Sequence, residues 1–438
     1  MLMNNSYLYV TDGSVLQFGP QAEVLNDYEL HCQNGKIIYC GPSAQAPPAP
    51  QDARRLKADN GLIMPGLINT HTHAAMTLMR GIADDLELHT WLNKHIFPVE
   101  SKLNADAVYW GSLLACLEMI RGGTTCFADM YYFPHQTVKA VRQAGLRASL
   151  GETLLDTLTS TPKDMEIAIN KVKDFCREHQ KSEDIRPTLN LHSVYTCSPK
   201  LLRQGGRLSE ELNIDLQMHL CETREELNIC QSAYGKLPVA HIHDLGLLSS
   251  RLWLAHGVWI NTEEAKVLAQ FQVGVAHCPN SNMKLASGRA DVPGMLDAGV
   301  KVALGTDGCA SNNRLDMFNE MDVCAKMHKL ATLDSTAMPA GQVLRMGTAL
   351  AAQVLNWPAL GELVTDALAD FIVVDFHQPH LAPVNNYISH LVYAANRSDV
   401  RHTVCQGRVL MENRHIPHLD EEEIMARAKE QITRMLGR

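Results

Sequence analysis

The chain has 438 residues, of which 46% are hydrophobic and 20% are charged, a usual composition for a globular protein with a large core. A net charge of −9, without any basic block of five or more residues, excludes a typical nucleic-acid-binding protein. No stretch reaches the roughly 18 uncharged apolar residues of a membrane span, and the start lacks the features of a signal peptide. We therefore expect a cytoplasmic protein with a small-molecule partner and no nucleic-acid or membrane partner. Its twelve scattered cysteines, which form no CxxC pair, are mostly small buried hydrophobic residues.

The first 61 residues carry strand and turn signals. The stretches YLYVTDG (7–13) and YELHCQNGKIIYCG (28–41) are typical of hairpin strands, and a Pro- and Ala-rich stretch follows at 42–51. This pattern predicts β-structure without intervening helices.

From residue 62 onward, short β-rich apolar runs alternate with longer amphipathic stretches such as 106–122 and 224–235. This alternation is typical of βα units around a parallel sheet. The eight runs are 62–73, 122–130, 147–154, 186–194, 215–223, 252–260, 273–282 and 300–308. Eight such units predict an α/β fold, a TIM-type (β/α)8 barrel over residues 62–360.

The last segment returns to the character of the first. Residues 369–376 and 400–416 are strand-like with turn signals, and 420–437 is an amphipathic helix with an acidic start and a basic end. We predict that residues 1–61 and 361–438 form one small composite β-sandwich domain with a C-terminal helix.

Two His-x-His pairs have different structural contexts. His71 and His73 end a predicted strand, where residues two apart share a face, so both imidazoles can converge on one ion. His241 and His243 lie in a helical stretch, where residues two apart point in different directions. The first pair therefore predicts half of a metal site, and the second pair does not.

Titratable residues also end the later apolar runs. A barrel brings the C-terminal ends of its strands to one mouth, where catalytic residues of this architecture lie. Any one of them alone could be a hydrogen-bonded, half-buried side chain, but their recurrence on six strands favours an active site. Besides the first pair, these residues are His192, His219 with Glu222, His256, His277 and Asp307.

The motifs around these residues resemble a known family. They read PGLINTHTHAAMTLMRGIADD (65–85), MHLCETREE (218–226), HCPNSNMKL (277–285) and LGTDGCASNN (304–313). In combination they resemble the amidohydrolase superfamily, specifically the 5-methylthioadenosine/S-adenosylhomocysteine deaminases and their triazine-hydrolase relatives. The resemblance covers nearly the whole chain.

The resemblance implies that one divalent metal ion is bound by His71, His73, His219 and Asp307. Three imidazoles and one carboxylate suit Zn²⁺, or alternatively Fe²⁺, and such an ion lowers the pKa of a water molecule to about 7. Binuclear members of the superfamily have a bridging lysine at the end of strand four. This chain has His192 there, so we expect a mononuclear site.

The resemblance also implies the catalytic roles. Glu222 would contact the base and protonate a ring nitrogen while water attacks the adjacent carbon. Asp307 would take the proton of the water and pass it to the leaving ammonia, and His256 would orient the water. The alternative for Glu222 is a solvated residue in the charge run 222–226.

By position in the family, Trp91 would lie against the nucleoside and Glu100 would bind the ribose hydroxyls. Both have an ordinary alternative, as a helix-face aromatic and a solvated acid. The resemblance places His192 and Ser311 at the sugar or base. His277 and Asn280 would shape the mouth of the barrel without a chemical step.

One departure from the family bears on the substrate. Some members hold the carboxylate of S-adenosylhomocysteine with arginines in the loop after strand three, whereas the corresponding loop here, 151–167, has none. We therefore expect adenosine or 5-methylthioadenosine as substrate, with S-adenosylhomocysteine weaker.

Two rival functions are a guanine or oxidised-guanine deaminase or triazine hydrolase of the same architecture, and a metal-binding barrel without catalysis. Glu222 argues against the second, because a structural metal site needs no acid beside it. The sequence leaves the oligomeric state open, including a homo-oligomer.

Overall fold

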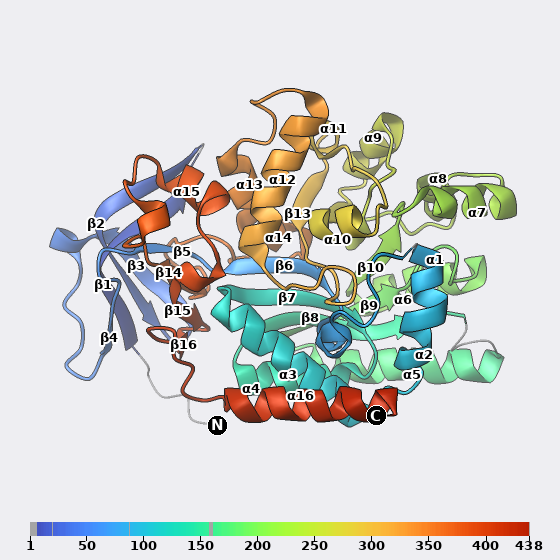
Figure 1. Cartoon of the computed structure of the whole chain (residues 1–438), viewed down its shortest axis with the longest axis horizontal. Coiled ribbons are helices and arrows are strands. Elements are labelled where there is room, and N and C mark those ends of the chain that lie inside the picture. The colour runs from blue at the N-terminus through green and yellow to red at the C-terminus, as the bar shows by residue number, and fades with distance from the viewer. Residues whose placement is uncertain (1–6, 20, 87, 157–160, 438) are drawn as a thin grey trace.

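A computed structural model describes residues 7–19, 21–86, 88–156 and 161–437. It contains two sheets, a parallel one in the barrel and a mixed one built from both ends of the chain (Figure 1). Among the described residues, no helix is long and apolar enough to cross a membrane.

The eight predicted βα strands form one parallel sheet in chain order, which confirms the predicted barrel. Nearly every strand residue is buried, because helices cover the outside and side chains fill the inside. The strands are β6 (Leu67–Thr72), β7 (Thr124–Tyr131), β8 (Arg147–Leu154), β9 (Ile185–Leu191), β10 (Asp215–Leu220), β11 (Leu252–His256), β12 (Gly274–His277) and β13 (Lys301–Leu304).

The first and last strands of this sheet are joined by individual hydrogen bonds. Thr70 Oγ1 donates to the Leu304 carbonyl at 2.9 Å, and the Asp307 amide donates to the His71 carbonyl at 3.0 Å. These bonds nearly close the barrel. They also fix the segment after β13 directly beside His71 and His73.

The helices that follow the barrel strands agree with the predicted amphipathic stretches, for example 106–122 for α3 and 224–235 for α7. The helices up to β13 are α1 (Leu88–Trp91), α2 (Phe97–Glu100), α3 (Ala105–Arg121), α4 (Pro134–Ala144), α5 (Pro162–His179), α6 (Pro199–Leu212), α7 (Arg224–Tyr234), α8 (Pro238–Asp244), α9 (Thr262–Gln270), α10 (Pro279–Lys284) and α11 (Val292–Asp297). Those after it are α12 (Met317–Thr332), α13 (Ala340–Met346), α14 (Ala349–Val354), α15 (Tyr387–Tyr393) and α16 (Glu421–Leu436). Four short 3₁₀-helices are η1 (Ser43–Gln45), η2 (Ala74–Met79), η4 (Pro379–Leu381) and η5 (Arg397–Asp399) in the described residues, and η3 (Leu92–Ile96) is a short π-helix.

Both ends of the chain contribute to the mixed sheet, as predicted. Strand β1 bulges near Gly13, and the bulge lets it pair with β4 before Gly13 and with β5 after it. The strands are β1 (Tyr7–Phe18), β2 (Ala22–Gln33), β3 (Lys36–Pro42), β4 (Arg54–Lys57), β5 (Leu62–Pro65), β14 (Phe371–Val374), β15 (Val400–Cys405) and β16 (Arg408–Met411). Side chains from this sheet, including Val10 of β1, Leu30 of β2 and Phe371 of β14, form a buried apolar cluster.

Two predicted runs are divided differently in the structure. The run 62–73 is not one strand, because β5 pairs with β14 in the mixed sheet and only β6 belongs to the barrel. Gly66 separates them, and a Cβ atom at this position would lie 2.1 Å from Thr125 Oγ1. The run 273–282 is also wrong at its end, since β12 stops at His277 and α10 follows.

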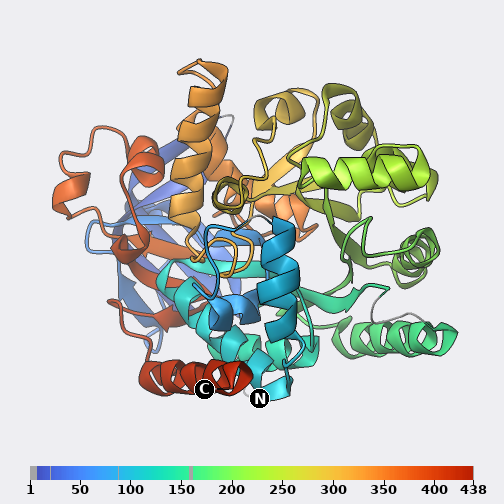
Figure 2. The same cartoon turned by 45° about the vertical axis from the view of Figure 1, so that its right-hand side comes forward.

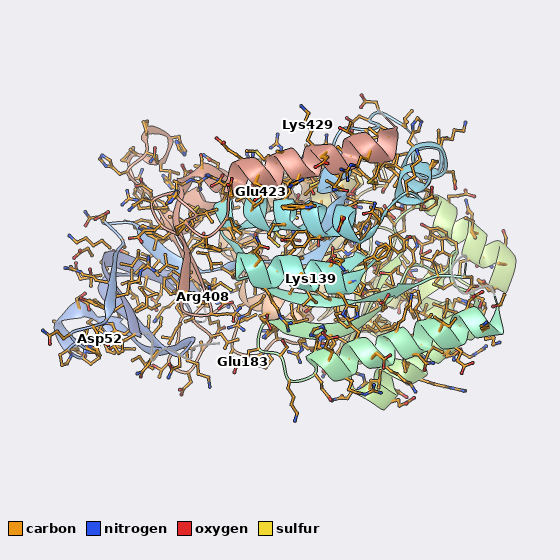
Figure 3. All side chains as sticks on the ribbon, turned by 90° about the horizontal axis from the view of Figure 1, so that it is seen from below. Asp52, Lys139, Glu183, Arg408, Glu423 and Lys429 are labelled. Atoms are coloured by element: carbon orange, nitrogen blue, oxygen red, sulfur yellow. The ribbon has the colours of Figure 1, made fainter. Side chains whose placement is uncertain are left out.

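The C-terminal helix α16 forms where predicted but lies on the barrel, not on the mixed sheet. It packs alongside α3, and the Arg121 guanidinium forms an ion pair with Glu421. Figure 3 shows α16, with Glu423 and Lys429, running beside α3 and α4. The division of the chain into two domains at residues 62 and 361 therefore stays a prediction. Two elements do not follow it, since β5 belongs to the mixed sheet and α16 lies on the barrel.

A buried ion pair links the barrel to the mixed sheet. Arg147 Nε at the start of β8 donates to Asp370 Oδ2 at 2.8 Å, and both side chains are at most 3% exposed. The other carboxylate oxygen accepts from the Gln406 amide at 2.8 Å, and Arg147 also donates to the Glu183 carbonyl. Each charge thus has hydrogen-bond partners within the protein.

We predict that Arg147→Met lowers the free energy of unfolding by about 3–5 kcal/mol, because it leaves the Asp370 carboxylate buried without its cation. Urea denaturation measures the change. The matched control is Arg54→Met, which removes the exposed pair of Arg54 with Glu412 and should cost less than about 1 kcal/mol. Equal effects of the two substitutions would contradict the prediction.

Candidate active site

A cavity of about 650 Å³, including its opening, lies at the mouth of the barrel. The segment from α1 through η3 to α2 lies across this end of the barrel (Figures 1 and 2). The cavity thus has a floor of strand ends and a wall from the connection between β6 and β7. The predicted site residues that line it are His73, Trp91, Glu100, His192, His219, Glu222, His256, Asp307 and Ser311.

The four predicted metal ligands converge at the bottom of this cavity. Ligand atoms of His71, His73 and His219 lie within 4.8 Å of one another, as do those of His71, His256 and Asp307. Asp307 Oδ1 is 3.3 Å from His73 Nε2 and 3.5 Å from His71 Nε2. Three imidazole nitrogens and a carboxylate oxygen form a donor set that suits Zn²⁺.

Backbone carbonyls orient two of the imidazoles. His73 Nδ1 donates to the Met130 carbonyl at 2.5 Å, and His219 Nδ1 donates to the His192 carbonyl at 2.9 Å. These bonds leave the Nε2 lone pair of each ring free for an ion, as is usual for metal-binding histidines. Burial lowers the pKa of His219 well below its ordinary value, so this ring stays neutral.

His71 is fully buried, and its Nε2 has no hydrogen-bond partner among the described residues. An unpartnered buried nitrogen is costly, and a metal ion would satisfy it. Its Nδ1 lies 2.7 Å from the side-chain amide of Gln217 on β10. The atom in contact is the amide nitrogen Nε2, while Gln217 Oε1 has no hydrogen-bond partner among the described residues. The ligating tautomer of His71 carries its proton on Nδ1, so it requires the amide to be turned with Oε1 toward the ring. The residues present therefore fit a metal ion.

Asp307 is held in place from several directions. The hydroxyls of Ser281 and Ser311 each donate to Oδ2 at 2.7 Å, and the Gly308 amide donates to Oδ1 at 2.7 Å. Asp307 adopts a left-handed backbone conformation with φ of 63°, which Asp tolerates better than most residues. Burial opposes its ionisation, but the imidazoles of His71 and His73 hold the pKa of Asp307 well below its ordinary value.

Glu222 lies at the turn between β10 and α7. Its backbone and that of Cys221 donate to the buried carboxylate of Glu226, at 2.8 and 2.9 Å. Burial, followed by the charge of Asp307, raises the pKa of Glu222 to about 8, so this carboxyl is largely protonated at pH 7. Glu222 is therefore a buried acid in the cavity and not a solvated member of a charge run.

His256 ends β11 close to this acid. Its Nε2 is 3.8 Å from Glu222 Oε2, and its Nδ1 lies 3.1 Å from the Asn282 amide nitrogen. Burial lowers the pKa of His256 to about 4, so the ring is neutral and can hydrogen-bond a water molecule through Nε2. The backbone at His256 is also left-handed, with φ of 75°.

The predicted substrate contacts line the rest of the cavity. Trp91 is 5% exposed, and its indole N–H donates to the Ala83 carbonyl at 3.0 Å. Glu100 accepts a hydrogen bond from the Tyr131 hydroxyl at 2.7 Å, and burial raises its pKa. His192 Nδ1 lies 2.9 Å from the Thr196 hydroxyl, which leaves its Nε2 free. Trp91 and Glu100 are therefore in the cavity, not on a solvated face.

Two expectations about the mouth differ from the structure. His277 and Asn280 do not line the cavity among its described residues. His277 is fully buried behind it, 3.4 Å from His328 on α12, and the Asn280 amide donates to Glu320. The two residues turn away because β12 ends at His277 and the chain enters α10.

The sequence did not single out Gln217, Glu226 and Tyr131. Gln217 precedes His219 by two residues and therefore shares its face of β10. The strand period of two could thus have predicted that Gln217 lies at the site. Glu226 follows Glu222 by four residues, but its neighbours in the charge run hide its burial. Tyr131 ends β7, whose charged residue Asp129 was not counted among the titratable strand ends although it accepts from Thr72 and from the Ala74 amide.

Comparisons with known proteins agree with this site. A model of the amidohydrolase family matches residues 62–410. The chain is 47% identical over 423 residues to 5-methylthioadenosine/S-adenosylhomocysteine deaminase of Syntrophobacter fumaroxidans, covering 96% of this chain and 97% of the relative. It is 42% identical over 433 residues to 5′-deoxyadenosine deaminase of Methanosarcina mazei, covering 98% and 99%.

Solved structures share the fold over the whole chain. The crystal structure of an adenosine deaminase from Xanthomonas campestris with bound zinc superposes with a TM-score of 0.95 at 33% identity, covering 98% of this chain and 99% of that chain. An atrazine chlorohydrolase from Arthrobacter aurescens complexed with zinc has a TM-score of 0.90 at 23% identity, covering 97% and 100%, and shows the fold alone. The family model and the relatives of high identity show that this chain belongs to the amidohydrolase family, as its motifs predicted.

Proposed function

We propose that the protein is a metal-dependent deaminase that hydrolyses the 6-amino group of an adenine nucleoside and releases ammonia. The observation that carries the proposal is a buried carboxyl, Glu222, in the same cavity as the His71, His73, His219 and Asp307 donor set, where burial raises its pKa to about 8. The names of the relatives, which are deaminases of adenine nucleosides, support this substrate class. We propose Zn²⁺ as the ion, since the adenosine deaminase of similar structure contains zinc.

When bound, the ion supplies a water molecule that is nucleophilic at neutral pH. Asp307 is ionised and beside the ligating imidazoles, so it can take the proton of this water. His256 is neutral and points at the same region, so it can orient the water through Nε2. These two residues prepare the attack on C6 of the base.

Glu222 activates the base from the other side. Its protonated carboxyl donates a proton to ring nitrogen N1, which makes the adjacent C6 electron-poor and open to attack by water. The C6 hydroxyl then loses its proton to the Glu222 carboxylate and becomes a carbonyl, the C6–N bond breaks, and Asp307 returns its proton to the leaving amino group as ammonia. Glu226 keeps the backbone of Glu222 in position through its two amide contacts.

The rest of the cavity lining supports a nucleoside over a free base. Trp91 and Tyr131 offer aromatic surface, the Glu100 carboxyl lies beside Tyr131, and the His192 ring lies 4.9 Å from that of His219. We propose that Trp91 packs on the nucleoside and that Glu100 binds the ribose hydroxyls. Ser311 contacts Asp307, so its contribution to the substrate is through the position of that carboxylate.

A second cavity favours a neutral 5′-substituent. It shares Phe97, Glu100, Tyr132 and Thr153 with the first cavity, so a nucleoside tail can extend into it. Its described lining is mostly apolar and has no arginine; its one cation, Lys171, accompanies the carboxylates of Glu152 and Asp164. Residues 157–160 of the adjoining loop lie outside the described residues. A methylthio or hydroxyl tail suits this lining better than the charged tail of S-adenosylhomocysteine.

The first experiment is an ultraviolet and ammonia assay of zinc-loaded protein with adenosine, 5-methylthioadenosine, S-adenosylhomocysteine and guanine. We expect conversion of the first two to the inosine-type products ahead of S-adenosylhomocysteine. Preference for S-adenosylhomocysteine would overturn the proposal about the tail and keep the reaction. Turnover of guanine, or of a triazine, without turnover of any adenine nucleoside would overturn the proposed function.

We predict that His71→Ala and His73→Ala each abolish activity and weaken metal binding. The loss of affinity should exceed the about 10–100-fold that is typical when a residue that only hydrogen-bonds a metal ligand is removed. Metal content after gel filtration, measured by elemental analysis, checks this. His243→Ala is the matched control, because it changes the exposed member of the other His-x-His pair in α8. Full metal content and activity in both ligand variants would refute the metal site.

We predict that Glu222→Gln lowers kcat/KM about 10²–10⁴-fold, because the amide cannot deliver the proton to the base. Its metal content should stay unchanged, which separates loss of the acid from loss of the site. Glu225→Gln, which alters an exposed carboxylate three residues further on, should behave as the wild type. Equal activity of the two variants would remove Glu222 from the mechanism.

A further inference from the structure

A second group of metal-ligand side chains lies outside the cavity. Ligand atoms of His277, Cys324 and His328 are within 4.8 Å of one another, and all three residues are fully buried. His277 ends β12, and the other two residues lie on α12. None of the steps proposed for the reaction uses them.

The spacing of the group suits metal binding. Cys324 and His328 are four residues apart on one helix, so their side chains lie on the same face. His277 comes from a strand end that faces this helix, and its Nε2 is 3.4 Å from that of His328. A strand and a helix are rigid elements, so the three ligand atoms are held together before any ion binds.

The two rings make a long hydrogen bond whose separation also fits a shared ion. The separation of 3.4 Å is longer than the 2.7–3.2 Å range that is usual when an N–H donates. Two nitrogens bound tetrahedrally to one zinc ion at about 2.0–2.1 Å lie about 3.3 Å apart. The observed separation is close to that value.

The polar atoms of the group are also incompletely satisfied. Among the described residues, Nδ1 of His277 and Nδ1 of His328 have no hydrogen-bond partner, although both rings are buried. Buried imidazole nitrogens without partners are uncommon. An ion bound through the two Nε2 atoms that face each other holds each ring in the tautomer with its proton on Nδ1, and the Cys324 thiol offers the third ligand.

We propose that His277, Cys324 and His328 form a second, structural Zn²⁺ site that clamps β12 to α12. Two imidazoles and one thiolate are ligands that zinc prefers, and a water or a backbone carbonyl completes its four-fold coordination. Binding releases the thiol proton, since burial, followed by the charge of Glu320, raises the pKa of Cys324 far above neutrality in the absence of an ion.

The clamp lies behind residues that position the catalytic groups. The segment after His277 places Ser281 on Asp307 and Asn282 on His256. An ion that fixes the end of β12 therefore fixes the start of this segment. The proposed second site does not line the cavity, so ion binding there is independent of the substrate.

The test uses the full-length protein loaded with Co²⁺ alone, because a cobalt–thiolate bond gives a charge-transfer absorption in the near ultraviolet. The ligand set at His71, His73, His219 and Asp307 has no sulfur, so this band reports only on the second group. We expect two equivalents of cobalt per chain and the thiolate band. One equivalent without the band in the wild-type protein overturns the proposal.

Variants separate the two sites. Cys324→Ser should lose the band and one equivalent of cobalt, and His328→Gln should do the same, while both keep the metal at the barrel mouth. His71→Ala should lose the other equivalent and keep the band, so failure of either site is distinguished from failure of the other. Cys176→Ser, which changes a buried cysteine on α5, is the control. A band that persists in Cys324→Ser, or disappears in Cys176→Ser, overturns the proposal.

Discussion

The arrangement of the site depends on keeping several imidazoles neutral in a small buried volume. Burial lowers the pKa of His71 and of His256 to about 4, so both rings stay neutral with a lone pair available at physiological pH. Asp307 supplies the single negative charge, and its neighbours favour the ionised form. Because neutral imidazoles attract one another only weakly, contacts among the rings contribute little to the stability of the fold. The cluster is instead already arranged to bind a cation. The metal site is therefore the feature to which the rest of the barrel mouth is fitted.

This constraint explains the backbone at the strand ends. Cys221, His256 and Asp307 all have positive φ, which for a residue other than glycine is uncommon and costs free energy. In each case the turn points a functional side chain into the cavity, and hydrogen bonds from the loops hold it there. Glu226, Asn282 and Ser281 provide these bonds from outside the ligand set. The barrel supplies the rigidity that offsets the local strain.

The sequence predicted the barrel and the site where local pattern and tertiary position agree. His71 and His73 were identifiable because a strand period of two puts both on one face. The single run 62–73 was wrong because an apolar pattern does not record that the chain changes sheets at Gly66. The burial of Glu226 and the direction of His277 depend on contacts with distant elements, which one sequence does not reveal. The roles of Trp91 and Glu100 remain predictions, although both line the cavity.

Chemistry and selectivity come from different parts of this chain. The proposed metal ligands and the acid lie at the ends of β6, β10 and β13, while Trp91 and Glu100 come from the connection between β6 and β7. Changes in that connection can alter the pocket without disturbing the strand ends. The fold is accordingly shared at 23% identity with an atrazine chlorohydrolase, whose name implies a different substrate. The wall of the cavity, and not the barrel shared with other proteins, therefore determines which substrate is bound.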